Sequence, residues 1–180
     1  MAALTVVVTF HSRGGSTESL AHAAAVGAVQ ARALIRLRRV ADTDEAGALE
    51  RFTDCRDTLA RMHKEYVAPR EADVAAADVL VLASPADVLP TAPEWTPVVA
   101  MLERMHAEGK LAGKVAAVVP TGTSSAAFDA LVRRLGLEAV TDEGADTDEM
   151  TDVDRAVALG RRAALAAGQL RGHAETGSSK

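Results

Sequence analysis

The sequence HSRGGST, residues 11–17, combines glycines and hydroxyl side chains where an apolar, strand-like run gives way to a helical pattern. The first turn of a helix leaves backbone N–H groups unpaired and carries the positive end of the helix dipole, so it can hold an anion. Glycine lets a ligand approach the backbone closely. The candidate ligands in this segment are Ser12, Gly14, Gly15, Ser16 and Thr17. These residues predict a site for a phosphate group.

Two features of this segment have alternative interpretations. Arg13 either adds positive charge to the site or points into solvent. The hydroxyls of Ser16 and Thr17 either donate to a ligand or cap the helix, in which case the segment is only a tight turn. His11 and Ser12 are not expected to form a base–nucleophile pair, because neighbouring side chains on a strand point to opposite faces.

Other phosphate-binding motifs are absent from the sequence. No strand-like run is followed by G-x-G-x-x-G, and no glycine is followed by Lys-Ser or Lys-Thr, which a Walker sequence requires. A phosphoacceptor receiver domain would need acidic residues after the first strand and an aspartate at the end of the third. Ser84 and Pro85 stand at that third position. These classes are therefore excluded.

The composition is typical of one globular domain, since 48% of the 180 residues are hydrophobic and 25% are charged. A net charge of -5 argues against a nucleic-acid partner. No apolar run reaches the roughly 20 residues that cross a bilayer, and no basic segment of the kind found in signal peptides precedes the first apolar run. We therefore expect a cytoplasmic protein without a membrane partner.

The remaining residues that could do chemistry have unremarkable interpretations. The single cysteine, Cys55, cannot form an intramolecular disulfide, and its place on an apolar helical stripe favours a buried thiol over a reactive one. The histidines are interpreted as surface or boundary residues, and no metal site is expected. The acidic run 142–150 matches no calcium loop and is interpreted as solvated, with docking of a basic partner as an alternative.

Strand-like and helix-like segments alternate along the whole chain. The strand-like segments are 4–10, 33–40, 78–84, 114–120 and 137–142. The helical segments are 17–29, 44–66, 96–109, 125–136 and 151–170. Alternation of this kind, with continuous apolar strands, predicts a parallel sheet with helices on both faces. We expect one doubly wound α/β domain over residues 1–170 and a disordered polar tail over residues 171–180.

In an open α/β sheet, ligands bind beyond the carboxyl ends of the strands. The loops after strands one, three and four are therefore the candidate site, and they read HSRGGST, SPADVLPTAPEW and PTGTSS. Together they resemble the flavodoxin-like family, nearest the WrbA-type NAD(P)H:quinone oxidoreductases. The family motifs S-x-x-G-x-T-E, G-[TS]-P and S-T-G-T are similar to residues 12–18, 83–85 and 120–123. The lead-in GKLAGKVAAVV, residues 109–119, is similar to a family segment as well.

The resemblance covers most of residues 4–168 and implies a flavodoxin-like sheet in the order 2-1-3-4-5. It implies that FMN is the cofactor, with its phosphate on the loop after strand one. The flavin ring would lie against the backbone of Pro85, Ala86, Asp87, Val88 and Leu89. The third side of the site would be closed by Thr121, Gly122 and Thr123. NAD(P)H would reduce FMN, and the electrons would pass to a quinone or a related acceptor without any required acid or base from the protein.

The sequence departs from the WrbA-type pattern in two loops. The family's P-T-R-F-G-N after strand three is replaced by PADVLP, and an acid at Asp87 would disfavour a reduced, anionic flavin. The long segment after strand five is replaced by the short acidic run. Two alternatives to an oxidoreductase therefore stay open, namely an FMN-holding electron carrier that serves a redox protein and a flavin-free binding module. The resemblance also implies a homo-oligomer. Trp95 is interpreted as an anchor of the following helix, with stacking on the flavin as the alternative.

Overall fold

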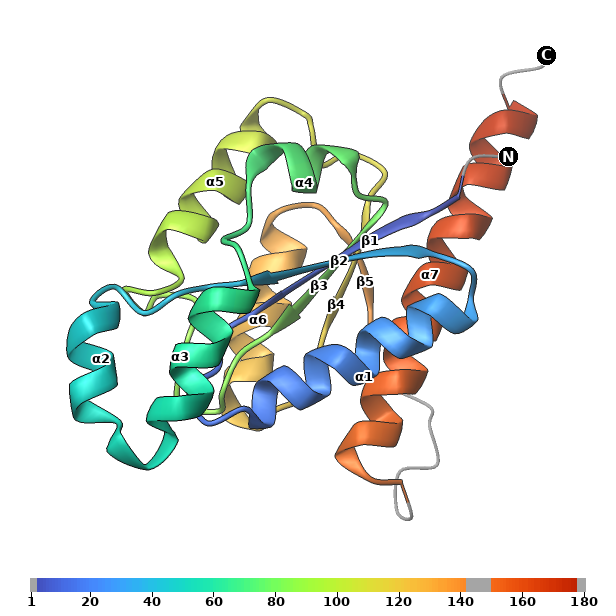
Figure 1. Cartoon of the computed structure of the whole chain (residues 1–180). Helices are drawn as coiled ribbons and strands as arrows, with labels where there is room; N and C mark the ends of the chain where they lie inside the picture. Colours follow the sequence, from blue (N-terminus) through green and yellow to red (C-terminus); the bar gives the residue numbers. More distant parts are fainter. Residues whose placement is uncertain (1–2, 142–149, 178–180) are drawn as a thin grey trace.

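The computed structural model describes residues 3–141 and 150–177. Five strands form one parallel sheet in the order β2-β1-β3-β4-β5 (Figure 1), which confirms the predicted architecture and strand order. The strands are β1 (Thr5–Phe10), β2 (Leu34–Arg39), β3 (Val79–Ala83), β4 (Val115–Val118) and β5 (Glu138–Val140). Each of them lies within a segment that the sequence predicts as a strand.

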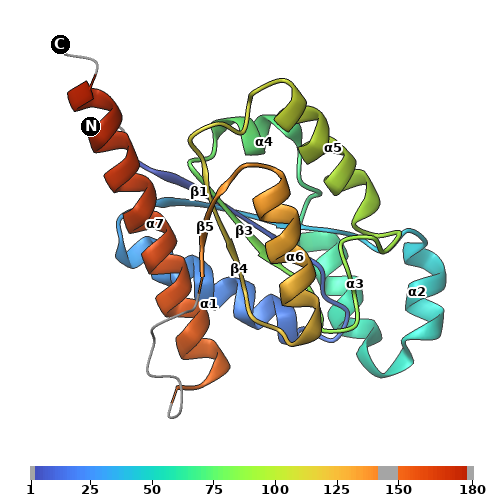
Figure 2. The same cartoon turned by 180° about the vertical axis from the view of Figure 1, so that it is seen from behind.

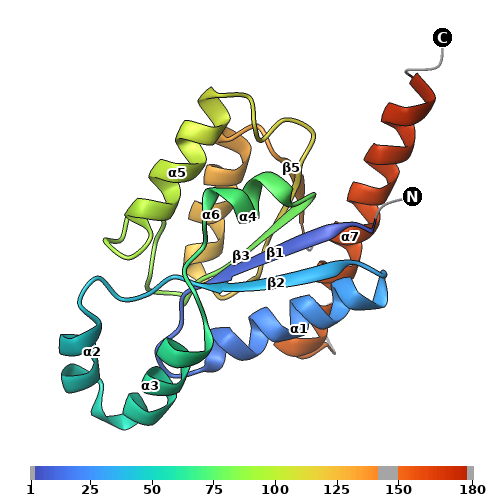
Figure 3. The same cartoon turned by 45° about the horizontal axis from the view of Figure 1, so that its top comes forward.

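Helices cover both faces of this sheet (Figure 3). The helices on one face are α1 (Ser16–Gln30), α3 (Arg56–Glu65) and α7 (Asp152–Gly177). The helices on the other face are α4 (Glu71–Ala76), α5 (Thr96–Ala107) and α6 (Thr123–Arg134). The domain therefore has three layers, with a separate apolar core on each side of the sheet.

The central strand β1 supplies both cores because successive side chains on a strand point to opposite faces. Val6 and Val8 are buried in the core that contains α1 and α7, whereas Val7 is buried in the core that contains α5 and α6. This explains why the valines at positions 6–8 are consecutive rather than alternating with polar residues.

Helices α1 and α7 cross in backbone contact (Figure 2), and two glycines permit this approach. A Cβ atom on Gly27 would lie 1.8 Å from the carbonyl oxygen of Val157, and one on Gly160 would lie 1.9 Å from the carbonyl oxygen of Ala24. Alanines fill most of the remaining interface, as the scarcity of aromatic residues requires. The crossing fixes the first turn of α7 relative to α1.

The segment 44–66, predicted as one helix, consists of three elements. Helix α2 (Glu45–Arg51) ends at Phe52, whose backbone angles of φ -103° and ψ 63° are not helical. A short 3-10 turn, η1 (Thr53–Cys55), then leads into α3. Cys55 in this turn is half-buried rather than buried, and its thiol donates to the carbonyl oxygen of Phe52 at 3.6 Å. Helix α4 was not predicted from the sequence.

The C-terminal region also differs from its prediction. Helix α7 continues to Gly177, so residues 171–177 are helical where the sequence predicted a disordered tail. Residues 178–180 and most of the acidic run 142–150 lie outside the described residues, so their interpretation stays a prediction. None of the described helices is both long and apolar enough to span a membrane.

Candidate functional site

A pocket of about 630 Å³ lies where the loops after β1, β3 and β4 meet. Its walls come from α1, from the loops after β3 and β4, and from the first turn of α7. The lining residues are Ser16, Thr17, Leu20, Pro85, Ala86, Pro120, Thr121, Gly122, Ser125, Asp152 and Arg155. The volume is within the usual range for a cofactor pocket. The structure thus brings together the three loops that the sequence predicts as one site.

The N-terminus of α1 opens onto this pocket without a capping side chain. Gly15 precedes the helix in a left-handed conformation, with φ of 90°, which other residues rarely adopt. The hydroxyl of Ser12 accepts from the Gly15 N–H at 3.1 Å, one residue before the helix begins. Ser16 and Thr17 do not cap the helix, and both line the pocket. The first-turn N–H groups are therefore available to an anion.

The loop after β4 is held against the loop after β3. The hydroxyl of Thr121 donates to the carbonyl oxygen of Ser84, and the Thr121 N–H donates to the Ser125 hydroxyl at 2.9 Å. Gly122 has a φ of 97°, and a Cβ at this position would lie 3.1 Å from the Cβ of Ala86. A side chain at residue 122 would therefore push the two loops apart.

The loop after β3 is anchored from below by Trp95. The Trp95 Nε1–H donates to the Ser84 hydroxyl at 3.0 Å, and this hydroxyl donates to the carbonyl oxygen of Val88 at 2.8 Å. The indole is fully buried and packs edge-on against Phe128, with ring centres 4.8 Å apart. Trp95 does not line the pocket, so its interpretation as a hydrophobic anchor is confirmed.

The predicted residues contribute unequally to the pocket. Those that line it are Ser16, Thr17, Pro85, Ala86, Thr121 and Gly122. The loop after β3, residues 85–89, is the one that the resemblance places against the flavin ring, and we call it the ring loop. In this loop, Asp87 is exposed outside the pocket and Val88 is buried in the core. Leu89 lines a separate surface depression of about 320 Å³. Ser12 and Gly15 precede α1 and do not line the pocket, and Gly14 is exposed. The side chain of Thr123 is not among those described. Only the first two residues of the ring loop therefore face the pocket.

Arg13 neither enters the pocket nor points freely into solvent. Its Nε donates to Asp42 at 2.7 Å and its Nη2 donates to Glu94 at 2.8 Å. The guanidinium also lies 4.7 Å from the centre of the Phe52 ring. Neither interpretation of Arg13 from the sequence describes this arrangement, in which its guanidinium pairs with two carboxylates.

Arg155 supplies the pocket with a positive charge that the sequence analysis did not identify. It lies in the first turn of α7 and pairs with Asp152, which also lines the pocket. Its Nε is buried and has no hydrogen-bond partner in the part of the chain that the structure describes. A buried N–H without a hydrogen-bond partner is energetically costly. The sequence does not indicate this role, because Arg155 lies in a helix and not in a loop that directly follows a strand.

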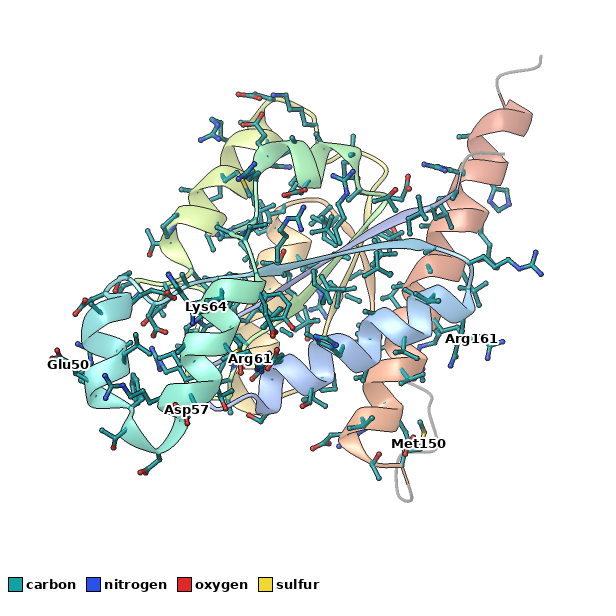
Figure 4. The ribbon with its side chains drawn as sticks, in the orientation of Figure 1. Glu50, Asp57, Arg61, Lys64, Met150 and Arg161 are labelled. Atoms are coloured by element: carbon teal, nitrogen blue, oxygen red, sulfur yellow. The ribbon has the colours of Figure 1, made fainter. Side chains whose placement is uncertain are left out.

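The start of α1 is tied to α3 by Glu18. Its carboxylate accepts from Arg61 at 2.6 and 3.0 Å and from the Tyr66 hydroxyl at 2.7 Å. Arg61 lies between α3 and the beginning of α1 (Figure 4). Burial alone would raise the pKa of Glu18, but the hydrogen bonds from Arg61 and Tyr66 lower it overall. Burial and the neighbouring Glu18 raise the pKa of Tyr66 to about 12. Glu18 is therefore ionised yet neutralised close to the anion site.

His11 is fully buried, which corrects its interpretation as a surface or boundary residue. It follows β1, and its Nδ1 lies 2.9 Å from the carbonyl oxygen of Val40, beyond the end of β2. Burial lowers the pKa of His11. The residue is covered because the chain returns over it after β2, which the local sequence does not reveal.

No protein-family model matches the sequence, and no curated protein is detectably similar to it. Solved structures, in contrast, resemble it over most of its length. A flavodoxin, WrbA-like protein from Agrobacterium tumefaciens matches with a TM-score of 0.59 and 19% identity, covering 93% of this chain and 99% of that one. The Streptococcus pneumonia TIGR4 flavodoxin matches with a TM-score of 0.57 and 17% identity, covering 90% and 98%.

A short-chain flavodoxin associated with a bacterial microcompartment matches with a TM-score of 0.58 and 16% identity, covering 91% of this chain and 99% of that one. The chain therefore has a flavodoxin-like fold. Because the WrbA-like protein and the flavodoxins match about equally well, the fold does not select between these subtypes.

Proposed function

We propose that this protein binds FMN in the pocket between the loops after β1, β3 and β4, and that it acts in electron transfer. The observation that carries the proposal is the uncapped N-terminus of α1, which opens onto a pocket that Arg155 also lines. Bound FMN would supply hydride and electron transfer, while the protein supplies position and hydrogen bonds.

The donors of the pocket suit a phosphate group. Ser16 and Thr17 offer hydroxyls beside the first-turn N–H groups of α1, and Arg155 offers a buried Nε–H without a partner. Helix N-termini hold anions through both their free donors and their dipole. An arginine adds a permanent charge. Thus α7, rather than Arg13, would provide the cation of the site.

The remaining walls suit a flat, apolar ring. Leu20, Pro85, Ala86 and Pro120 supply apolar surface on three sides of the pocket. Among the described residues, no aromatic side chain lines it, so a flavin ring here would pack on aliphatic groups and backbone. Gly122 allows the loops after β3 and β4 to lie close together.

Within this class, we propose NAD(P)H-dependent reduction of quinones or related acceptors, on the resemblance of the three loops to WrbA-type sequences. A carrier that exchanges electrons with a redox protein is the second candidate. The electron carrier is favoured because Asp87, Val88 and Leu89 do not line the pocket. The loop after β3 therefore offers few residues that could contact a substrate beside the flavin ring. NAD(P)H oxidation by the purified protein with a quinone would support the first candidate. A bound FMN that only a partner protein reduces would support the second.

Titration of FMN into the protein, followed by quenching of flavin fluorescence, tests the proposal. We expect saturable binding with a micromolar or lower Kd. Ser16→Asp places a carboxylate at the anion site while keeping a residue that suits a helix start, so FMN affinity should fall by at least about tenfold. Ser19→Asp, on the exposed side of the same turn, is the matched control. A folded wild-type protein that ignores FMN would overturn the proposal and leave a flavin-free binding module.

A further inference from the structure

A second cluster of chemically capable side chains lies outside the pocket, where β1 and β2 end. A ring nitrogen of His11 and one carboxylate oxygen each from Asp42 and Glu94 lie within 4.8 Å of one another. The three residues come from separate segments, namely the end of β1, the loop after β2 and the loop before α5. None of them lines the proposed FMN pocket. Asp42 and Glu94 also line a second cavity of about 280 Å³.

One ring nitrogen of His11 is buried and has no hydrogen-bond partner among the described residues. The side chain is 0% exposed, and its Nδ1 contacts the carbonyl oxygen of Val40 at 2.9 Å. A carbonyl only accepts, so Nδ1 carries the proton and Nε2 carries a lone pair. Nε2 is buried and has no hydrogen-bond partner within residues 3–141 and 150–177. A backbone carbonyl on the other ring nitrogen is also the usual support of a metal-binding histidine.

The guanidinium of Arg13 holds the two carboxylates together. Arg13 bridges Asp42 and Glu94, although about a quarter of its own side chain is exposed to solvent. Asp42 is almost fully buried, and its one other ion pair among the described residues is a long contact with Arg39, at 3.5 Å. The buried Asp42 and the partly buried Glu94 need compensating positive charge, which either a guanidinium or a metal ion supplies.

We propose that His11 Nε2, Asp42 and Glu94 form a binding site for one divalent transition-metal ion such as Zn²⁺, and that Arg13 occupies it in the metal-free protein. One imidazole and two carboxylates suit borderline ions of this kind. Ligand atoms around tetrahedral Zn²⁺ lie roughly 3.4 Å apart, so the side chains must close by about 1 Å when Arg13 swings out. The bound ion would join the three segments and release Arg13.

Calorimetric titration of chelator-treated, tag-free protein with ZnCl₂ tests this site, and Co²⁺ absorption spectra report the ligand set. We expect one equivalent to bind. Glu94→Gln, at the edge of the cluster, and His11→Gln should each weaken binding by at least about tenfold, since even supporting residues cost that much. Arg13→Ala should instead tighten binding by roughly fivefold, because it removes the competing cation.

Two exposed histidines provide matched controls. His63→Gln removes an imidazole that contacts Glu45, and His22→Gln removes one that contacts Tyr66, so neither should change Zn²⁺ affinity. If His11→Gln does not fold by circular dichroism, Glu94→Gln decides the question. No binding, binding that survives both cluster substitutions, or weaker binding in Arg13→Ala would each overturn the proposal.

Discussion

The indole N–H of Trp95 donates to the hydroxyl of Ser84 across a fully buried contact of 3.0 Å. Ser84 is the residue that follows β3, and its carbonyl oxygen also accepts from Thr121. Through Ser84, the single tryptophan therefore holds the loops after β3 and β4 where they leave the sheet. This contact connects the core beneath the pocket to the shape of the pocket itself.

Ser84→Ala should destabilise the protein by about 1–3 kcal/mol, because it leaves the buried Trp95 N–H without an acceptor. Urea denaturation followed by far-UV circular dichroism measures this loss, because the Trp95→Phe background used for comparison lacks the single tryptophan. In a Trp95→Phe background the donor is already gone, so the same serine substitution should cost less. Equal costs in both backgrounds would show that the hydrogen bond contributes nothing.

Arg155→Ala should weaken FMN binding by about ten- to a hundredfold, the effect of losing a hydrogen bond to a charged group worth roughly 1.5–3 kcal/mol. Riboflavin lacks the phosphate, so its affinity should not change. Arg161→Ala, an exposed position on the same helix (Figure 4), is the control. Parallel fluorescence titrations with both flavins give the result. An equal loss for FMN and riboflavin would place Arg155 away from the phosphate.

The fold and the meeting of the three loops could be predicted from the sequence because they depend on local patterns. Continuous apolar runs define buried parallel strands, and parallel strands bring their following loops to one edge of the sheet. The three loops meet as a consequence. The break at Phe52 was missed because the apolar stripe continues through it into α3.

Side-chain partners far apart in the sequence could not be predicted in this way. Arg13 pairs with residues 29 and 81 positions away, and these distant carboxylates decide where its charge goes. Arg155 reaches the pocket only because α7 crosses α1 at a particular angle, which Gly27 and Gly160 allow. His11 is buried by a loop that its neighbours in sequence do not indicate. Tertiary contacts, not residue types, assign these three roles.

Gly160→Ala should destabilise the protein by about 1–3 kcal/mol or more, because its Cβ would lie 1.9 Å from the carbonyl oxygen of Ala24. Gly172→Ala on the same helix is the matched control. A Cβ at that position meets nothing within 4 Å, so alanine should be neutral or stabilise the helix by up to about 1 kcal/mol. Thermal or urea unfolding compares the two variants. Equal stability of both would mean that α1 and α7 are further apart than described.

Asp73 should make the stability of the protein sensitive to acid. Its carboxylate accepts from Arg38 at 2.7 and 2.8 Å and from Arg36 at 3.1 Å. These hydrogen bonds, those from Arg38 above all, lower the pKa of Asp73 from 3.8 to about 2 although burial opposes the shift. The folded protein therefore releases this proton more readily than the unfolded chain, so the stabilisation is complete above about pH 5 and is lost as the pH falls through about 2.

Asp73→Asn should remove about 1–2 kcal/mol at pH 7, a value reduced from the full pKa shift because Arg38 and Arg36 are partly exposed to solvent. The same variant should lose less stability than the wild type between pH 5 and pH 2, since it has no carboxylate to protonate at this position. Urea unfolding at several pH values measures both effects. Glu50→Gln, an exposed position on α2 (Figure 4), should leave the pH profile unchanged. A pH profile of Asp73→Asn that runs parallel to the wild type would show that this carboxylate has the same pKa in the folded and unfolded chains.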